Sequence, residues 1–229
     1  EILIFLRDIC IILGIVLILR TYIASPFRIN GSSMESNYHN NELIIVDKIS
    51  YNLWIWDITN NNPQRWDVVV IQPHSIAGKD FFIKRIVGMP GDKLKIEDGY
   101  VYIKTLETAN YIKLNENYLN EENLWKTFPG RSSLKTEFNI PDNEYFILGD
   151  NRNGSSDSRD CFYTCSNDGS SHFIKRKDII WRLWVTLGAI RFLESKNVLI
   201  NDTGTNENIH SSSIFSVTPR FLETPATWN

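Results

Sequence analysis

Hydrophobic residues gather at the start of the chain in one long run. Ile2 to Leu19 is mostly Ile, Leu and Val, broken only by Arg7 and Asp8. The uninterrupted part, Ile9 to Leu19, is too short to cross a bilayer core of roughly 30 Å, but the apolar residues beside it extend it to the roughly 20 residues that a spanning helix needs. The pattern therefore predicts a membrane anchor helix over residues 1–25, ended by Pro26.

A cleaved secretory signal has a similarly short apolar core and is the alternative to an anchor. Against it, no small-x-small cleavage pattern follows the core, because Arg20-Thr21-Tyr22 is bulky and charged. Arg7 and Arg20 lie on opposite sides of the core, so charge alone gives no orientation. The chain starts with Glu1 rather than Met, which is typical of a fragment or a processed form.

After Pro26 the hydrophobic residues come in short runs rich in β-branched and aromatic side chains, separated by polar and turn-forming residues. Such runs predict strands or extended segments. The expected segments are Phe27–Ile29, Leu43–Val46, Val68–Ile71, Phe81–Val87, Lys93–Ile96, Tyr100–Ile103, Tyr145–Leu148 and Ile179–Val185. No long segment beyond the anchor has a helical period. We therefore expect a mainly β protein, an antiparallel β-sheet domain with an inserted subdomain, preceded by an N-terminal transmembrane helix.

Composition divides the rest of the chain. Residues 26–104 and 139–190 carry the predicted core strands, whereas residues 105–138 are polar and irregular and are predicted to be an inserted subdomain. Residues 191–229 are predicted to be a C-terminal extension that is partly mobile, because the sequence from Asn201 is rich in Ser, Thr and Asn. A chain of 229 residues with 42% hydrophobic residues can form one large domain with such an insertion.

Net charge and cysteine content limit the kinds of partner and ligand that we expect for the chain. The formal net charge of −3 gives no electrostatic support to nucleic-acid binding. Cys10 lies in the apolar run and is interpreted as a small hydrophobic residue. Cys161 and Cys165 can form a local disulfide or remain free thiols. A zinc site would need a second ligand pair, and only His172 lies nearby, so we expect no metal.

Ser33 and Lys84 are the residues that narrow the chemistry most. Lysine, with a pKa of about 10.4, is almost never neutral at pH 7, but burial against apolar neighbours lowers its pKa. Strand alternation places Lys84 on the face shared by Phe82 and Ile86, with Arg85 opposite. An inward-facing lysine can act as the general base for a serine nucleophile. On composition alone, the alternative is a surface strand with Lys84 and Arg85 in solvent.

Six segments, in order along the chain, resemble the motifs of type I signal peptidases, which are membrane-bound proteases with a serine–lysine dyad. They are Arg20–Ile29, Gly31–Met34, Glu42–Lys48, Trp66–Val70, Lys84–Asp92 and Gly149–Arg159. The last two are complete, as Lys-Arg-Ile-Val-Gly-Met-Pro-Gly-Asp and Gly-Asp-Asn-Arg-Asn-Gly-Ser-Ser-Asp-Ser-Arg. Motifs of this length and order do not arise by coincidence, so the chain is identified as similar to this family.

The resemblance implies a role for each matching residue. Ser33 would be the nucleophile, Lys84 the general base, and Ser155 the serine that hydrogen-bonds and orients the lysine ammonium. The oxyanion would be held by the backbone N–H of Ser33, helped by the turn at Gly31 and Ser32. Some members have a serine hydroxyl where this chain has Gly31, so the hole would rely on backbone donors.

Further residues are implied to support the site or to contact the substrate. Asp157 and Arg159 would form a pair that braces their loop, and ion pairs with Arg152 or Arg159 are the plainer interpretation of Asp150 and Asp157. The implied structural residues are Arg85, Asp150, Asn151, Arg152, Asp157, Ser158 and Arg159. The implied substrate-binding residues are Ile29, Met34, Phe82 and Ile83.

Two departures from the family pattern stand out. After Ser33-Met34 the family usually has any residue followed by Pro-Thr, whereas this chain has Glu35-Ser36-Asn37. This alters the turn after the nucleophile without removing a catalytic group. After Arg159 the family commonly has a short aromatic-glycine segment, whereas this chain continues into the loop with Cys161 and Cys165, to which we assign no role.

By resemblance, the chain would be a membrane-bound serine endopeptidase that cleaves N-terminal signal peptides from exported preproteins through an acyl-enzyme, with no metal or organic cofactor. Its partners would be signal-peptide-bearing preproteins and the lipid bilayer, with no nucleic acid. It would lie in the plasma membrane as a single-pass protein, its catalytic domain on the extracytoplasmic side.

Other functions have less support. A self-cleaving regulator of the same serine–lysine clan would need a DNA-binding domain and an internal cleavage site. A membrane-tethered β-domain that has lost catalysis would not need Ser33 and Lys84. His39, His74, His172 and His210 follow no hydrolase or metal-binding spacing. The aromatic segment Trp54-Ile55-Trp56 fits either the membrane interface or core packing.

Overall fold

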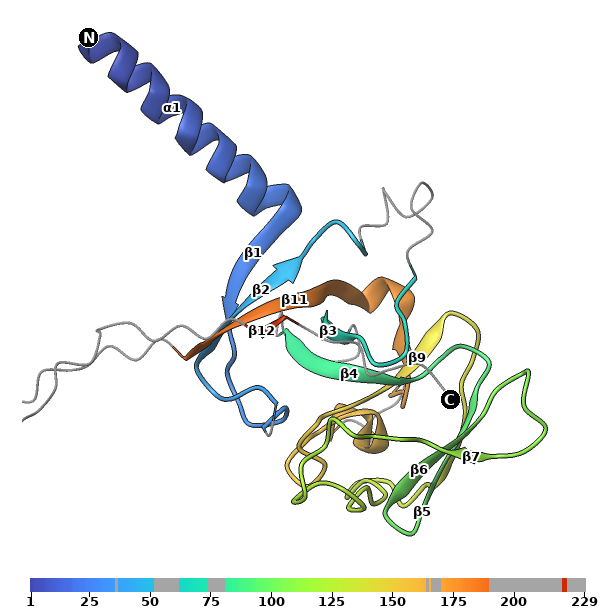
Figure 1. Ribbon diagram of the computed structural model, residues 1–229. Helices are drawn as coiled ribbons and strands as arrows, with labels where there is room; N and C mark the ends of the chain where they lie inside the picture. The colour runs from blue at the N-terminus through green and yellow to red at the C-terminus, as the bar shows by residue number, and fades with distance from the viewer. Residues whose placement is uncertain are drawn as a thin grey trace, which may run out of the picture.

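The protein consists of an N-terminal helix that stands apart from a body of antiparallel sheets (Figure 1). The computed structural model describes residues 1–35, 37–51, 62–73, 81–163, 165, 170–189 and 220–221. In chain order the elements are α1 (Ile2–Ile18), η1 (Leu19–Ile23), β1 (Ala24–Arg28), β2 (Glu42–Asp47), β3 (Val68–Ile71), β4 (Phe82–Gly88), β5 (Lys93–Glu97), β6 (Tyr100–Lys104), β7 (Ile112–Lys113), β8 (Glu137–Asn139), β9 (Glu144–Leu148), η2 (Ser158–Tyr163), β10 (Ile174–Lys175), η3 (Arg176–Asp178), β11 (Ile179–Ala189) and β12 (Arg220–Phe221). The expectation of a mainly antiparallel β protein with one N-terminal apolar helix is confirmed.

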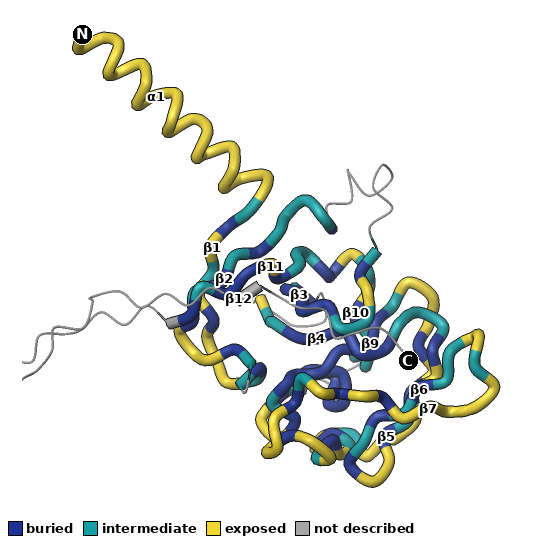
Figure 2. Tube along the Cα trace, in the orientation of Figure 1, coloured by how far each residue is buried: buried dark blue, intermediate teal, exposed yellow. Residues whose placement is uncertain are grey.

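The N-terminal helix is long and apolar enough to cross a membrane. α1 and the π-helical turn η1 together run from Ile2 to Ile23, which is 22 residues and about 33 Å. The helix is exposed along its whole length in Figure 2, so the body of the protein does not cover its apolar surface. The helix ends at Ile23, earlier than the predicted end at Pro26, because Ala24 already pairs with Asp47.

The larger sheet has the strand order β1-β2-β11-β3-β4-β9-β10, with β12 paired to β11. β1 is therefore an edge strand, which explains how it contains Pro26, a residue that cannot donate a backbone hydrogen bond. β11 pairs with β2 along one side and with β3 along the other, and its register shifts three times. β4 lies between β3 and β9, so both sides of its backbone are hydrogen-bonded.

The smaller sheet has the order β7-β6-β5-β8. β5 and β6 form the predicted hairpin around Asp98 and Gly99. Gly99 has φ +82, and a side chain there would meet the backbone of Trp125, so only glycine fits this turn. Two of the strands precede residue 105 and two lie within or beside residues 105–138, so the boundaries given for an inserted subdomain stay a prediction.

Three groups of buried side chains hold these sheets in place. One lies between the smaller sheet and β4 and β9, and includes Val87, Leu94, Phe138 and Phe146. A second packs around β3, β4 and β9. The third lies beneath the segment that carries Ser33, and its buried members are Ile29, Met34, Tyr38, Ile44, Val46, Val68, Val70 and Leu183. This third group fixes the segment after β1 against the larger sheet.

Some predictions fall on residues that the structure does not describe. Trp54-Ile55-Trp56 lies outside the described residues, as do His74 and His210. Of the C-terminal extension 191–229, only Arg220 and Phe221 are described, as β12. The short strands β7, β8 and β10 were not predicted, because two or three residues are too few to display an alternating pattern.

Candidate active site

Ser33 and Lys84 are 51 positions apart in the sequence and meet where the turn after β1 approaches β4 of the larger sheet. The Lys84 Nζ donates a hydrogen bond to the Ser33 Oγ at 2.8 Å and a second to the carbonyl oxygen of Ile83 at 2.9 Å. Lys84 lies in the middle of β4, and its backbone position is fixed by pairing with Val69 of β3. The structure therefore brings the predicted nucleophile and the predicted base within hydrogen-bonding distance, the arrangement that nucleophilic catalysis by serine requires.

The surroundings of Lys84 favour the neutral amine. The residue is 2% exposed. Burial lowers its pKa from 10.5 to about 8, although the carboxylates of Asp157 and Asp150 act in the opposite direction. Arg85 is also buried, on the opposite side of β4. The alternative of a surface strand with both cations in solvent does not hold.

The turn that carries Ser33 is held by its own backbone and by Met34. The N–H of Glu35 bonds to the Ser32 carbonyl oxygen at 3.0 Å, and the N–H of Gly31 donates to Asn40 Oδ1 at 3.0 Å. Gly31 has φ +111, a conformation that residues with side chains rarely adopt. Among the described residues nothing accepts a hydrogen bond from the Ser33 N–H, which is therefore free to bind an oxyanion.

The loop Gly149–Arg159 is hydrogen-bonded to the turn that carries Ser33. The Asn151 N–H donates to the Ser33 carbonyl oxygen at 3.1 Å, and the Asn151 side-chain amide donates to the Ser32 carbonyl oxygen at 3.0 Å. A side chain at Gly149 would come within 2.4 Å of the Ser33 carbonyl oxygen and 2.2 Å of the Ser155 Oγ. The close approach of loop and turn thus depends on glycine at 149.

Buried ion pairs set the shape of the loop. Asp150 pairs with Arg85 of β4 through two hydrogen bonds, of 2.9 and 2.6 Å. Asp157 pairs with Arg159 and also accepts the Gly149 N–H at 3.0 Å. Although burial alone would raise the pKa of Asp157, Arg159 and the Gly149 N–H lower it below its usual value. The carboxylate of Asp157 is therefore charged at neutral pH.

Two more implied residues support the loop from within. Arg152 pairs with Glu116 and donates to Tyr118 Oη at 3.0 Å. The Ser158 Oγ accepts the N–H of Ile147 at 2.9 Å, which attaches the end of the motif to β9. Sequence reasoning expected Arg152 or Arg159 as the partner of Asp150, but that partner is Arg85.

Ser155 lies close to the dyad without bonding to it. Its side chain is buried, and its Oγ has no hydrogen-bond partner among the described residues. Lys84 bonds instead to Ser33 and to the Ile83 carbonyl oxygen. The implied role of Ser155 in orienting the lysine therefore stays a prediction.

A cleft runs from the dyad along β1 and β4. Its volume is about 120 Å³, less than the roughly 300–1,000 Å³ of ordinary small-molecule sites. The four residues implied to contact substrate all line it with the dyad. The lining residues are Phe27, Arg28, Ile29, Asn30, Gly31, Ser33, Met34, Ile44, Val70, Phe81, Phe82, Ile83 and Lys84.

Sequence reasoning missed several residues that contribute to this region. Glu116 and Tyr118 come from the segment interpreted as irregular, and Asn37 was mentioned only as a departure from the family pattern. No spacing or composition signal indicates that they reach Arg152 and Asp150. Cys161 and Cys165 form a disulfide, one of the two alternatives left open. His172 lies beside it, with Nδ1 2.7 Å from the Ser158 carbonyl oxygen.

Comparisons with known proteins identify the family of this chain. The family described as "Signal peptidase, peptidase S26" matches residues 2–186. "Probable signal peptidase I-2" of Synechocystis sp. is 36% identical over 144 residues, which cover 61% of this chain and 56% of that protein. "Signal peptidase I S" of Bacillus subtilis is 31% identical over 156 residues, which cover 67% of this chain and 76% of that protein.

Among solved structures, the crystal structure of a signal peptidase I from Enterococcus faecalis V583 resembles this chain at a TM-score of 0.36 and 22% identity. The likeness covers 53% of this chain and 97% of that one.

Proposed function

The chain belongs to the signal peptidase family, peptidase S26, whose members are signal peptidase I hydrolases, and we propose that it cleaves signal peptides from exported preproteins with Ser33 as nucleophile and Lys84 as base. The observation that carries this proposal is the 2.8 Å hydrogen bond between a buried Lys84 Nζ and the Ser33 Oγ. The lowered pKa of Lys84 supports the same assignment, because a base must be neutral to accept a proton.

The reaction proceeds in two halves. Neutral Lys84 accepts the proton of the Ser33 hydroxyl as its Oγ attacks the scissile carbonyl, and the ammonium then gives that proton to the leaving amine. The signal peptide remains on Ser33 as an ester. Lys84, neutral again, takes a proton from water as the water oxygen attacks the ester carbonyl. The bond from that carbon to the Ser33 Oγ then breaks, the Lys84 ammonium returns the proton to Oγ, and the signal peptide leaves with a free carboxyl group.

The oxyanion of each tetrahedral intermediate would bind the Ser33 N–H, the backbone donor that the turn leaves open. The substrate would lie extended between the segment 27–33 and the segment 82–84, adding a strand by main-chain pairing. Small residues would fill the cleft beside Ile29, Met34, Phe82 and Ile83, in keeping with its volume of about 120 Å³.

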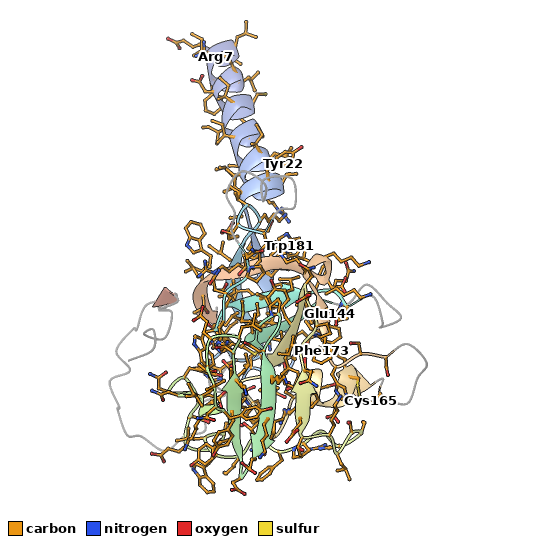
Figure 3. All side chains as sticks on the ribbon, turned by 90° about the vertical axis from the view of Figure 1, so that its right-hand side faces the viewer. Arg7, Tyr22, Glu144, Cys165, Phe173 and Trp181 are labelled. Carbon is orange, nitrogen blue, oxygen red and sulfur yellow. A yellow bond between two sulfur atoms is a disulfide. The ribbon has the colours of Figure 1, made fainter. Side chains whose placement is uncertain are left out.

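The helix Ile2–Ile23 would anchor the protein, with the catalytic body just outside the bilayer. Aromatic side chains at the foot of the helix support this arrangement, because such residues favour the membrane interface. Phe27 and Phe81 pack against Trp181, with ring centroids 5.0 and 5.4 Å away. Figure 3 shows Trp181 below Tyr22, at the end of the body from which the helix leaves. We place the protein in the plasma membrane as a single-pass protein whose catalytic domain faces the extracytoplasmic side.

Cleavage of a preprotein by the purified full chain in detergent tests the proposal. Wild type should release the signal peptide, whereas S33A and K84M should lose at least about a thousandfold in rate, the scale seen when a member of a catalytic group is removed. S133A and K93M, which change a serine and a lysine outside the site, are matched controls and should cleave at the wild-type rate. Equal cleavage by S33A or K84M would refute the assignment of that residue.

A further inference from the structure

Asn37 occupies a position where this chain departs from the family pattern. It stands four residues after Ser33, where threonine is usual in the family. Its side-chain amide donates to Asp150 Oδ2 at 2.7 Å and to the Tyr118 carbonyl oxygen at 2.9 Å. The turn after the nucleophile is thereby bonded, through a side chain, to two segments more than eighty residues away in the sequence.

Asp150 connects the segment that carries Ser33 to the strand that carries Lys84. Its carboxylate is 1% exposed and forms two hydrogen bonds with Arg85, the residue directly after Lys84 in β4. The Asp150 N–H donates to the Sδ of Met34 at 3.4 Å, and Met34 is the residue directly after Ser33. Asn37 bonds to the oxygen of Asp150 that also accepts from Arg85 Nη2. A continuous chain of bonds therefore runs from the Ser33 turn through Asn37 and Asp150 to Arg85.

We propose that Asn37 is a positioning residue for the dyad, which through Asp150 fixes the Ser33 turn against the strand that carries Lys84. The inference rests on the proposed function. Asn37 does not touch the reacting atoms. Its effect reaches them along the backbone, because Asn37 is four residues from Ser33, and Arg85, the partner of Asp150, is directly next to Lys84.

The hydrogen bond from Asn37 to Asp150 is expected to be stronger than an ordinary surface hydrogen bond. It is charge-assisted, since the amide donates to a carboxylate, and it is short. It lies in a partly buried position where the Arg85–Asp150 pair cannot shift without losing both of its own hydrogen bonds. A nucleophile displaced by about 1 Å can lose a hundredfold in rate, so a bond that fixes the turn affects turnover more than binding.

The electrostatic surroundings provide a second readout. The carboxylates of Asp157 and Asp150, which are paired with Arg159 and Arg85, lie near enough to Lys84 to act against the lowering of its pKa by burial. An aspartate at position 37 would add a negative charge beside Asp150 without changing the size of the side chain. That charge would favour the ammonium of Lys84, so the pH at which activity is half-maximal would move upward.

The test compares N37T with N37V in the full chain in detergent. Threonine and valine have nearly the same shape, but only threonine can donate to Asp150. We expect kcat of N37V to be about tenfold below that of N37T, with KM within twofold, because a hydrogen bond to a charged group is lost. N37T should stay within a few-fold of wild type, and N37D should have its half-maximal activity at higher pH.

Controls separate this inference from the proposed function. N153A removes an exposed asparagine of the Gly149–Arg159 loop, whose amide donates to the Glu122 carbonyl oxygen at 3.3 Å, and should behave as wild type. If wild type cleaves the preprotein and S33A does not, the proposed function holds, whatever the result for the variants at position 37. With that result in hand, equal kcat for folded N37V and N37T, or an unshifted pH profile for folded N37D, overturns the positioning role. Thermal unfolding of each variant establishes that it is folded.

Discussion

Replacement of Lys84 by methionine should abolish cleavage and, at neutral pH, make the protein more stable. Methionine has a similar length and no charge, so it fills the same space beneath Ser33 without a desolvation cost. Removal of an ordinary structural lysine leaves stability unchanged or lowers it. A gain in stability for K84M would therefore show that the amine is buried at a cost to stability, as expected of a functional group.

The magnitude follows from the pKa of Lys84. Burial lowers that pKa from 10.5 to about 8, and each unit corresponds to about 1.4 kcal/mol. Between these values the unfolded chain binds the proton and the folded chain does not, so wild-type stability increases as pH rises from 8 to 10.5. The cost of burying the lysine is therefore about 3 kcal/mol at pH 7 and about 1 kcal/mol at pH 10. Methionine also loses both hydrogen bonds of the amine. Loss of the bond to the Ile83 carbonyl oxygen offsets about 1 kcal/mol, whereas the partly exposed Ser33 Oγ can bond to water instead.

The net expectation for K84M is a gain of about 2 kcal/mol at pH 7 that disappears near pH 10. Urea unfolding of both proteins in the same detergent at the two pH values measures it, with K93M at an exposed position of β5 as the control. If K84M is no more stable than wild type at pH 7, or if its gain is the same at pH 10, the amine is not held against an unfavourable environment and the reasoning fails.

Two further predictions follow from the same charges. Since only neutral Lys84 accepts the proton of Ser33, kcat/KM of wild type should rise about tenfold per pH unit below pH 8 and level off above it; a constant value from pH 6 to 9, measured by initial rates, would contradict a lysine base. R85A should lower stability by about 3–5 kcal/mol in urea unfolding at pH 7, because it leaves the buried carboxylate of Asp150 without its cation. A loss below about 1 kcal/mol, the scale of an exposed pair, would mean that Asp150 finds another partner.

Local sequence patterns were sufficient for the main strands. The β-branched runs at Val68–Ile71 and Tyr145–Leu148 correspond to β3 and β9, because a strand buried on both faces needs apolar residues throughout. The hairpin of β5 and β6 follows from its turn residues. The resemblance to type I signal peptidases is confirmed by the family match over residues 2–186.

What the sequence could not indicate depends on contacts between distant segments. The partner of Asp150 is Arg85, 65 positions away, and not an arginine of its own loop. Glu116 and Asn37 reach the site from segments without a periodic pattern, so neither composition nor spacing identifies them. The pairing of Cys161 with Cys165 was open for a different reason, since a spacing of four residues permits a bond and does not require one.

The direct junction of helix and strand has a consequence for which bond is cut. β1 begins at Ala24, immediately after η1, so no flexible linker separates the helix from the cleft. Five residues of strand span about 17 Å. In a membrane-anchored protein, that fixed length sets the height of the attacking hydroxyl above the lipid surface. If the protein acts as proposed, a preprotein would have to present its scissile bond at the same height, and the length of its own apolar segment would then govern selection together with the side chains next to the cut.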